Sequence, residues 1–319
     1  MPPNRRIALV GATGNVGSQI AELIVQRNFS YSEFKLFARD SCGRMVDAGE
    51  RSFPVDLFNG PDDLSAFDIA FLAVSREIAV NIIEAQPGPI LIDLSSATAS
   101  PQKEVAMVAP GLTPRDQVAQ SSRRQLFAVP HPVAQLIATI LQVLGNDGFA
   151  AASIMLSASA SGHESVGQLF QQSADLLNAR LDLDDEPQVA FNVFAAPRAH
   201  ELAMTLAEQV RVLGARSNSL LLDIVRIPAF HGCAVNLFLP AHEAGAKWPE
   251  LLRSAPGLIV VANDDATGFV NAVGQEGAIT RISMENSGAA IWCVFDAARL
   301  AALTALWIAE TLSQSPVSE

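Results

Sequence analysis

The hydrophobic pattern in the first part of the chain predicts strands that alternate with helices. Residues 7–10 form a short, continuous apolar run, and apolar residues then recur at helical spacing over 16–24. Further apolar runs of strand length cover residues 34–37, 52–57, 68–74, 89–93 and 124–130. Helical spacing returns over residues 77–85 and 133–144. Runs that are apolar throughout are typical of strands buried on both faces, so this alternation indicates a parallel, doubly wound sheet in an α/β fold.

The pattern changes after residue 150, where strand-like segments follow one another with fewer helices between them. These segments cover residues 152–159, 219–226, 234–239, 257–261, 278–283 and 289–295. Helical spacing is found over residues 164–177 and again over 297–312. The arrangement predicts a second, α+β region built on a mixed or antiparallel sheet.

The first apolar run ends in a glycine-rich segment that opens the first predicted helix. Gly11, Gly14 and Gly17 are spaced as G-x-x-G-x-x-G. Between a strand and a helix, such glycines let the backbone approach a pyrophosphate closely, and the N–H groups of the helix N-terminus face its charge. This context predicts a Rossmann-type dinucleotide-binding site. The alternative is an ordinary strand-to-helix turn that needs glycine for its backbone angles.

Residues at other predicted strand ends complete the expected cofactor site, because ligands of doubly wound sheets bind at the carboxyl ends of the strands. The predicted set is Gly11, Thr13, Gly14, Asn15, Val16, Gly17, Arg39, Asp40, Ser75 and Ser96. Arg39 and Asp40 follow the second predicted strand, where an arginine favours a 2′-phosphate and an acid favours a 2′-hydroxyl. The two residues give both signals, with a slight balance toward NADP over NAD. An alternative of similar weight is that Arg39 and Asp40 only cap a loop and contact no cofactor.

Composition and charge narrow the class of protein. Half of the 319 residues are hydrophobic and 17% are charged, so the chain can bury a sizeable core. The net charge of −12 argues against nucleic acid or an anionic membrane as a partner. Three scattered cysteines and a first strand close to Met1 lead us to expect a cytoplasmic protein without a signal peptide or membrane span. We expect no metal site, since His231 and Cys233 form the only close pairing of ligand types.

Several motifs occur in an order that resembles the aspartate-semialdehyde dehydrogenase family. They are GATGNVG at 11–17, AR at 38–39, DLSSA at 93–97, AFN at 190–192, VRIPAFHG at 225–232 and IWCVFDAAR at 291–299. The resemblance implies an NAD(P)-binding domain formed by residues 1–130 and a returning C-terminal helix within 297–319. It also implies a substrate and dimerisation domain over 131–296, a homodimer built mainly on that domain's sheet, and a role in amino-acid biosynthesis.

The residues that carry the family's chemistry differ in this chain. Family members use a cysteine thiolate that attacks an acyl carbon, a histidine as acid and base, and hydride transfer with NADP. Pro132 stands at the position of the nucleophile, and Cys233 at that of the base. Arg226 matches the arginine that grips the substrate carboxylate, although it could instead pair with a structural carboxylate. The pattern resembles the Usg-type paralogues, which lack the catalytic cysteine, so we predict that dehydrogenase activity is absent.

Three hypotheses follow for the function. The first is a non-catalytic dimer that still binds NADP and acts by regulation or through an unidentified protein partner. The second is an active NADP-dependent oxidoreductase on an acyl phosphate or aldehyde, in which His131 and Cys233 could exchange the lost roles. The third is a scaffold with an empty nucleotide fold, which differs from the first only in cofactor binding.

Overall fold

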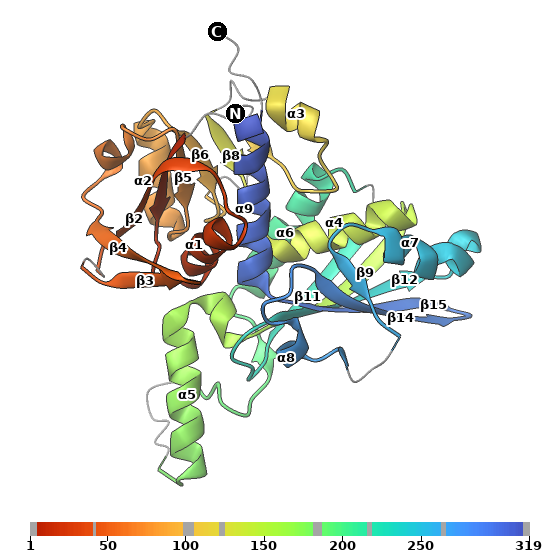
Figure 1. The fold of residues 1–319 in the computed structure, drawn as a ribbon. Coiled ribbons are helices and arrows are strands. Elements are labelled where there is room, and N and C mark those ends of the chain that lie inside the picture. The colour runs from red at the N-terminus through yellow and green to blue at the C-terminus, as the bar shows by residue number, and fades with distance from the viewer. Residues whose placement is uncertain are drawn as a thin grey trace. The chain divides into compact units, whose positions relative to one another are not determined.

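The protein divides into two compact units in a computed structural model (Figure 1), formed by Met1–Gln135 with Ala298–Glu319 and by Leu136–Ala297. The structure describes residues 5–40, 43–97, 105–120, 125–180, 187–215, 219–262 and 266–314. We refer to the two parts as unit 1 and unit 2.

Unit 1 is built on an eight-stranded sheet in the order β3-β4-β2-β1-β5-β6-β8-β7. Its strands are β1 Arg5–Val10, β2 Tyr31–Ala38, β3 Met45–Ala48, β4 Arg51–Leu57, β5 Ile69–Leu72, β6 Ile90–Asp93, β7 Ala106–Met107 and β8 Leu126–Ala128. The β3–β4 pair is antiparallel, and the other neighbouring pairs are parallel. The helical segments are α1 Asn15–Gln26, η1 Pro61–Leu64, α2 Arg76–Ala85, α3 Arg115–Gln120 and α9 Ala297–Gln314, and α4 Pro132–Leu144 begins here.

Strand β1 shows why this sheet is doubly wound. Its residues are 0–1% exposed from Ile7 to Val10 and alternate between two hydrophobic clusters. Ile7 and Leu9 pack in the cluster that holds α1 and α9, whereas Ala8 and Val10 pack in the cluster that holds α2. Helices therefore cover both faces of the sheet, and the predicted α/β class with a Rossmann-type domain is confirmed.

Unit 2 contains a mixed sheet of seven strands in the order β10-β11-β9-β12-β15-β14-β13. The strands are β9 Phe149–Leu156, β10 Phe194–Ala195, β11 Ser219–Arg226, β12 Cys233–Pro240, β13 Leu258–Val260, β14 Ala278–Glu285 and β15 Gly288–Phe295. The helical segments are η3 Ala158–Ser161, α5 His163–Leu177, α6 Ala199–Val212, η4 Glu243–Lys247, α7 Trp248–Ser254 and α8 Phe269–Ala272. β9 is parallel to β11 and antiparallel to β12, so the predicted mixed sheet is confirmed.

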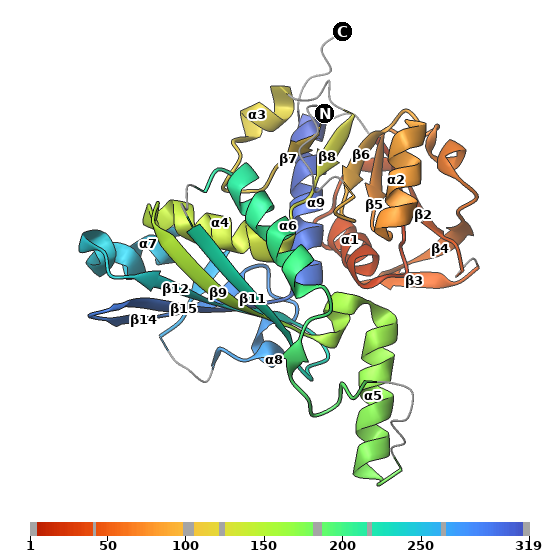
Figure 2. The same cartoon turned by 180° about the vertical axis from the view of Figure 1, so that it is seen from behind.

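The two faces of the second sheet are covered unequally. Helix α6 runs along β11 on one face (Figure 2), with buried Leu206 and Val210 directed inward. On the opposite face, Ala272 of α8 packs with Ala234 and Val294 in a small cluster. Beyond that cluster, Phe238 of β12 is 46% exposed and Leu221 of β11 is 62% exposed. Part of this face is therefore apolar and open to solvent.

The strand predicted over residues 152–159 lies differently in the structure. Strand β9 begins earlier, at Phe149, and ends at Leu156. The following residues turn into the short helix η3, where the hydroxyl oxygens of Ser157 and Ser159 lie 3.0 Å apart in a hydrogen bond. Local hydroxyl hydrogen bonding competes with the sheet ladder and ends the strand.

Candidate functional site

The sheet of unit 1 has a topological switch point between β1 and β5. The chain continues from β1 to β2 on one side and later returns to place β5 on the other side. The loops after β1 and β5 meet there, since a Cβ built on Gly11 would lie 2.2 Å from the carbonyl oxygen of Ala73. Ligands of open α/β sheets bind in the crevice at this kind of position.

Gly11 and Gly17 are required by the backbone itself. Gly11 has a φ of +87°, which side chains other than glycine rarely adopt. A Cβ on Gly17, in the first turn of α1, would lie 2.2 Å from the carbonyl oxygen of Gly11. These two glycines therefore allow α1 to pack on the turn that ends β1, whether or not a ligand is bound.

Gly14 differs from both of these glycines. It lies at the N-cap of α1 in an extended conformation, with φ −79° and ψ 166°, which any residue can adopt. A Cβ there would have one neighbour, the Gly11 carbonyl oxygen, at 3.4 Å. Neither backbone strain nor crowding by the described residues explains a glycine at this position. Close approach of a ligand to the backbone does explain it.

The start of α1 has the character of an anion site. The N-cap residue of this helix, Gly14, has no side chain that could cap it, and its first turn carries no acidic residue. Free N–H groups and the helix dipole at such a terminus favour a phosphate group. Thr13 is exposed, while Asn15 and Val16 are the first two residues of the helix. The residues present therefore fit the pyrophosphate of a dinucleotide.

The other predicted cofactor residues lie at the same edge of the sheet. Arg39 and Asp40 directly follow β2 and are both exposed. Ser75 is the exposed N-cap of α2, after β5, and its side chain makes no capping hydrogen bond. Because β1, β2, β5 and β6 are parallel, their carboxyl ends bring these loops to one edge of unit 1.

The loop that contains Ser96, after β6, is held by a residue that sequence reasoning missed. The carboxylate of Asp93 is 1% exposed and accepts hydrogen bonds from the N–H of Ser95 at 2.8 Å and from its hydroxyl at 2.5 Å. Ser96 itself has a φ of +60°, an uncommon conformation for serine. The signal was an aspartate at a strand end with a serine two residues later, a spacing that favours side-chain to backbone turns. Asp93 fixes this loop at the edge of the crevice.

The start of α4 carries no nucleophile. Pro132 is its first residue and has neither an N–H group nor a reactive side chain. The backbone N–H of Val133 donates a hydrogen bond of 3.2 Å to Nδ1 of His131. Burial lowers the pKa of His131 to about 4, so the imidazole is neutral near pH 7, and its ring proton is on Nε2. His131 therefore acts as a cap of α4.

In unit 2 the structure brings Arg226 and Cys233 to opposite sides of Leu156. Leu156 of β9 pairs with Arg226 of β11 on one side and with Cys233 of β12 on the other. Nε of Arg226 is buried without a hydrogen-bond partner among the described residues, and burial lowers the pKa of this guanidinium. Cys233 is 1% exposed, and burial raises the pKa of its thiol to about 12. Cys233 is thus a neutral thiol at physiological pH.

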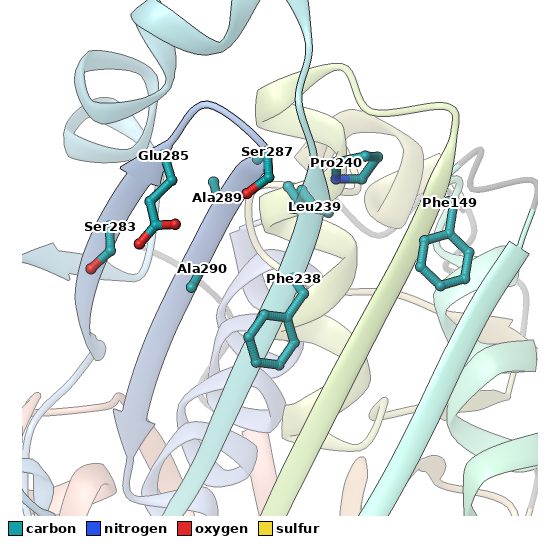
Figure 3. Close-up of a pocket in the computed structure, with 10 residues that line it drawn as sticks. Phe149, Phe238, Leu239, Pro240, Ser283, Glu285, Ser287, Ala289 and Ala290 are labelled. Atoms are coloured by element: carbon teal, nitrogen blue, oxygen red, sulfur yellow. The ribbon is translucent and has the colours of Figure 1, made fainter.

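The face of the second sheet that carries Phe238 is covered by α8 only in part; we call it the uncovered face. It contains a pocket of about 430 Å³ (Figure 3). Phe238 and Pro240 of β12 and Phe149 of β9 contribute its larger apolar side chains. Ser283 and Glu285 of β14 add polar groups at its other side. The pocket belongs to unit 2 alone and contains neither Arg226 nor Cys233.

The described residues contain neither a metal-binding cluster nor a membrane-spanning helix. No group of three or more histidine, cysteine, aspartate or glutamate side chains among them could hold a metal ion. Within the same part of the chain, no helix is both long and apolar enough to cross a membrane.

The fold and its glycine-rich loop define the class: unit 1 is a Rossmann-type nucleotide-binding domain joined to a mixed-sheet unit. Comparison with protein families agrees, because residues 6–121 match the model described as "Semialdehyde dehydrogenase, NAD binding domain". The aspartate-semialdehyde dehydrogenase of Aquifex aeolicus is 25% identical over 335 residues, covering 96% of this chain and 97% of that protein. The USG-1 protein homolog of Azotobacter vinelandii is 29% identical over 338 residues and 98% of both chains.

A solved structure supports the same relationship. The probable aspartate-semialdehyde dehydrogenase from Pseudomonas aeruginosa has a TM-score of 0.85 and 27% identity, with 98% of this chain and 99% of that chain covered. The resemblance identified from the sequence is therefore confirmed: over nearly its whole length the chain is similar to aspartate-semialdehyde dehydrogenases and to USG-1 proteins.

Proposed function

We propose that this protein binds NADP and lacks the dehydrogenase activity of its aspartate-semialdehyde dehydrogenase relatives. The observation that carries the proposal is Gly14, whose lack of a side chain is explained by neither its backbone conformation nor its neighbours. A loop that had become a structural relic would need only Gly11 and Gly17. An open backbone at Gly14 supports a working pyrophosphate site and disfavours the scaffold with an empty fold.

When bound, NADP would supply a nicotinamide that can accept or donate hydride. Gly14 and the start of α1 would hold the pyrophosphate, while Ser75 and the Ser96 loop would line the crevice at the ends of β5 and β6. Arg39 would pair with the 2′-phosphate as a planar, two-pronged donor.

The absence of dehydrogenase activity follows from the groups at the family's catalytic positions. Pro132 cannot form a thioester, and His131 is committed as a helix cap with its imidazole neutral. Cys233 is buried as an un-ionised thiol, and the thiol form is a poor nucleophile. These three observations disfavour the exchange of roles between His131 and Cys233.

A second candidate function is supported by one observation, the unpartnered Nε of Arg226. No described carboxylate pairs with this guanidinium, which disfavours a purely structural role for it. A substrate carboxylate would satisfy it through a bidentate contact. Such a site could serve an NADP-dependent oxidoreductase that uses other groups for proton transfer.

The uncovered face of the second sheet supports a homodimer. Phe149, Leu221 and Phe238 are 48%, 62% and 46% exposed, respectively, on this face. Large apolar side chains gathered on a solvent-facing sheet are typical of a protein interface. A second copy using the same face would bury them in a self-complementary contact.

The activity proposal is tested with purified protein, NADP, inorganic phosphate and aspartate semialdehyde, while reduced nicotinamide is followed by absorbance. We expect no turnover above a protein-free control in the wild type or in Cys233→Ser. Turnover that Cys233→Ser abolishes would contradict the proposal and establish the rebuilt thiol chemistry. Turnover that survives Cys233→Ser but is lost in Arg226→Ala would favour the second candidate.

A further inference from the structure

Arg299, the last residue of the IWCVFDAAR motif, is a buried cation at the start of a helix. It is the third residue of α9, belongs to unit 1 and is 7% exposed. This is an unfavourable place for a positive charge, because burial removes it from water and the positive end of the helix dipole lies beside it. A side chain that breaks both preferences needs partners that compensate for them.

The partners of Arg299 are three polar side chains of helix α1. Nη1 of the arginine donates to Oε1 of Gln19 at 3.0 Å, and Nη2 donates to Oε1 of Gln26 at 2.9 Å. Nη1 also lies 3.8 Å from Oε1 of Glu22, which supplies the opposite charge. The two glutamines donate in turn to the Glu22 carboxylate, at 3.3 Å and 2.6 Å. We call these four connected side chains the Arg299 clamp.

The clamp fixes how far α1 can slide or rotate against α9. Its three partner residues are spaced by three and four positions, so they share one face of α1 over about two turns. Apolar residues of the two helices, among them Leu23 and Leu306, also lie in one core cluster. Apolar packing is non-directional, whereas hydrogen bonds to a planar guanidinium have a fixed geometry. The clamp therefore sets the position of α1 more sharply than the apolar contacts do.

Helix α1 opens with the proposed pyrophosphate site. It begins at Asn15, and Gln19 lies about one turn beyond that residue. Gly17 allows α1 to approach the turn after β1, but it has no side chain that could hold the helix there. A binding site works when surrounding side chains hold it within about 0.5 Å of the productive geometry. Arg299 supplies such a hold from α9.

We propose that Arg299 is a positioning residue for nucleotide binding, because it holds the N–H groups at the start of α1 in place for the pyrophosphate. This inference rests on the proposed NADP binding and adds to it a buried residue of α9. The pyrophosphate is common to NADP and NAD. Loss of the clamp therefore lowers the affinity for both nucleotides and leaves the preference between them unchanged.

The test is calorimetric titration of the wild type, Arg299→Met and Arg5→Met with NADP and with NAD. Arg5 provides the matched control, because its Nη2 donates to the Leu312 carbonyl oxygen of the same helix α9 at 3.1 Å, a bond that does not involve α1. Both substitutions change the net charge equally. We expect Arg299→Met to weaken the binding of both nucleotides about tenfold or more. Arg5→Met should bind both as the wild type does.

The double variant Arg299→Met/Glu22→Gln separates positioning from stability and from long-range charge. It removes the carboxylate that Arg299→Met leaves without its cation, and it keeps the net charge of the wild type. Urea-induced unfolding should show that the double variant is more stable than Arg299→Met, whereas titration should show the same low affinity for both nucleotides. A purely structural role predicts that affinity returns together with stability.

Wild-type affinity in Arg299→Met, or affinity that returns in the double variant, would overturn the role of Arg299 and leave the proposed function standing. A loss confined to NADP would also overturn it, because the effect would then depend on the 2′-phosphate. Wild-type protein that binds neither nucleotide would overturn both proposals.

Discussion

Gly17 lies so close to Gly11 that a Cβ on Gly17 would be 2.2 Å from the Gly11 carbonyl oxygen. The packing of α1 on β1 therefore depends on Gly17. We predict that Gly17→Ala lowers the free energy of unfolding by about 1–3 kcal/mol, since an added methyl group must displace backbone. Gly14→Ala should change it by less than about 0.5 kcal/mol, because that position is extended and uncrowded. Urea-induced unfolding measures both variants, and an equal loss in the two would contradict this distinction between the glycines.

We predict that Cys233 does not react with iodoacetamide in the folded protein near neutral pH. Burial excludes the reagent, and a thiol pKa of about 12 leaves almost no thiolate. Peptide mapping by mass spectrometry measures the modification of this residue, and urea-unfolded protein, in which it should be alkylated, is the control. Rapid labelling of Cys233 in the native protein would show that the thiol is accessible and ionised, which this account does not allow.

His131 should make the protein less stable as the pH falls. Its pKa is about 4 in the folded protein and near 6.5 when unfolded, so between these values the unfolded chain binds the proton. The free energy of unfolding should therefore fall by about 2 kcal/mol more in the wild type than in His131→Asn between about pH 7.5 and pH 5. Asparagine can also cap a helix, and His163→Asn at the exposed start of α5 controls for the loss of one imidazole. Parallel pH profiles of wild type and His131→Asn would exclude this linkage.

Phe238→Arg should convert the proposed dimer into a monomer. A charge placed on the uncovered sheet face would have to be buried unpaired in the interface, whereas the monomer can solvate it because Phe238 is 46% exposed. Sedimentation velocity measures the oligomeric state, and Met204→Arg on α6, where the side chain is 62% exposed, is a control away from this face. A wild-type monomer, or a dimer that persists in Phe238→Arg, would exclude this interface.

The architecture was largely predictable because its central strands carry strong local patterns. Strand β1 was predicted from an apolar run that packs on both sides, as the two clusters around it now show. Helix α6 was missed, since its inner face includes Gln209, which is fully buried and interrupts the apolar stripe. Strand β3 was missed because its four residues have no strong pattern of their own and are placed by pairing with β4.

The residues of the candidate site were predicted from the sequence, but the sequence did not distinguish those required for packing from those available to a ligand. The three glycines of the loop look equivalent along the sequence. They differ because Gly11 meets the carbonyl oxygen of Ala73, a residue more than sixty positions away, while Gly14 meets almost nothing. Tertiary contacts of this kind leave no periodic trace in a sequence.

The central claim is tested most directly by calorimetric titration of the wild type, Gly14→Ala and Arg39→Ala with NADP, with NAD as the comparison. We predict that the wild type binds NADP with a dissociation constant of about 1 mM or lower and prefers it to NAD. Gly14→Ala should remain folded and lose affinity for both nucleotides, whereas Arg39→Ala should lose affinity for NADP alone. A wild type that gives neither heat nor a thermal shift with either nucleotide would contradict the account and identify the glycine loop as a relic of the fold.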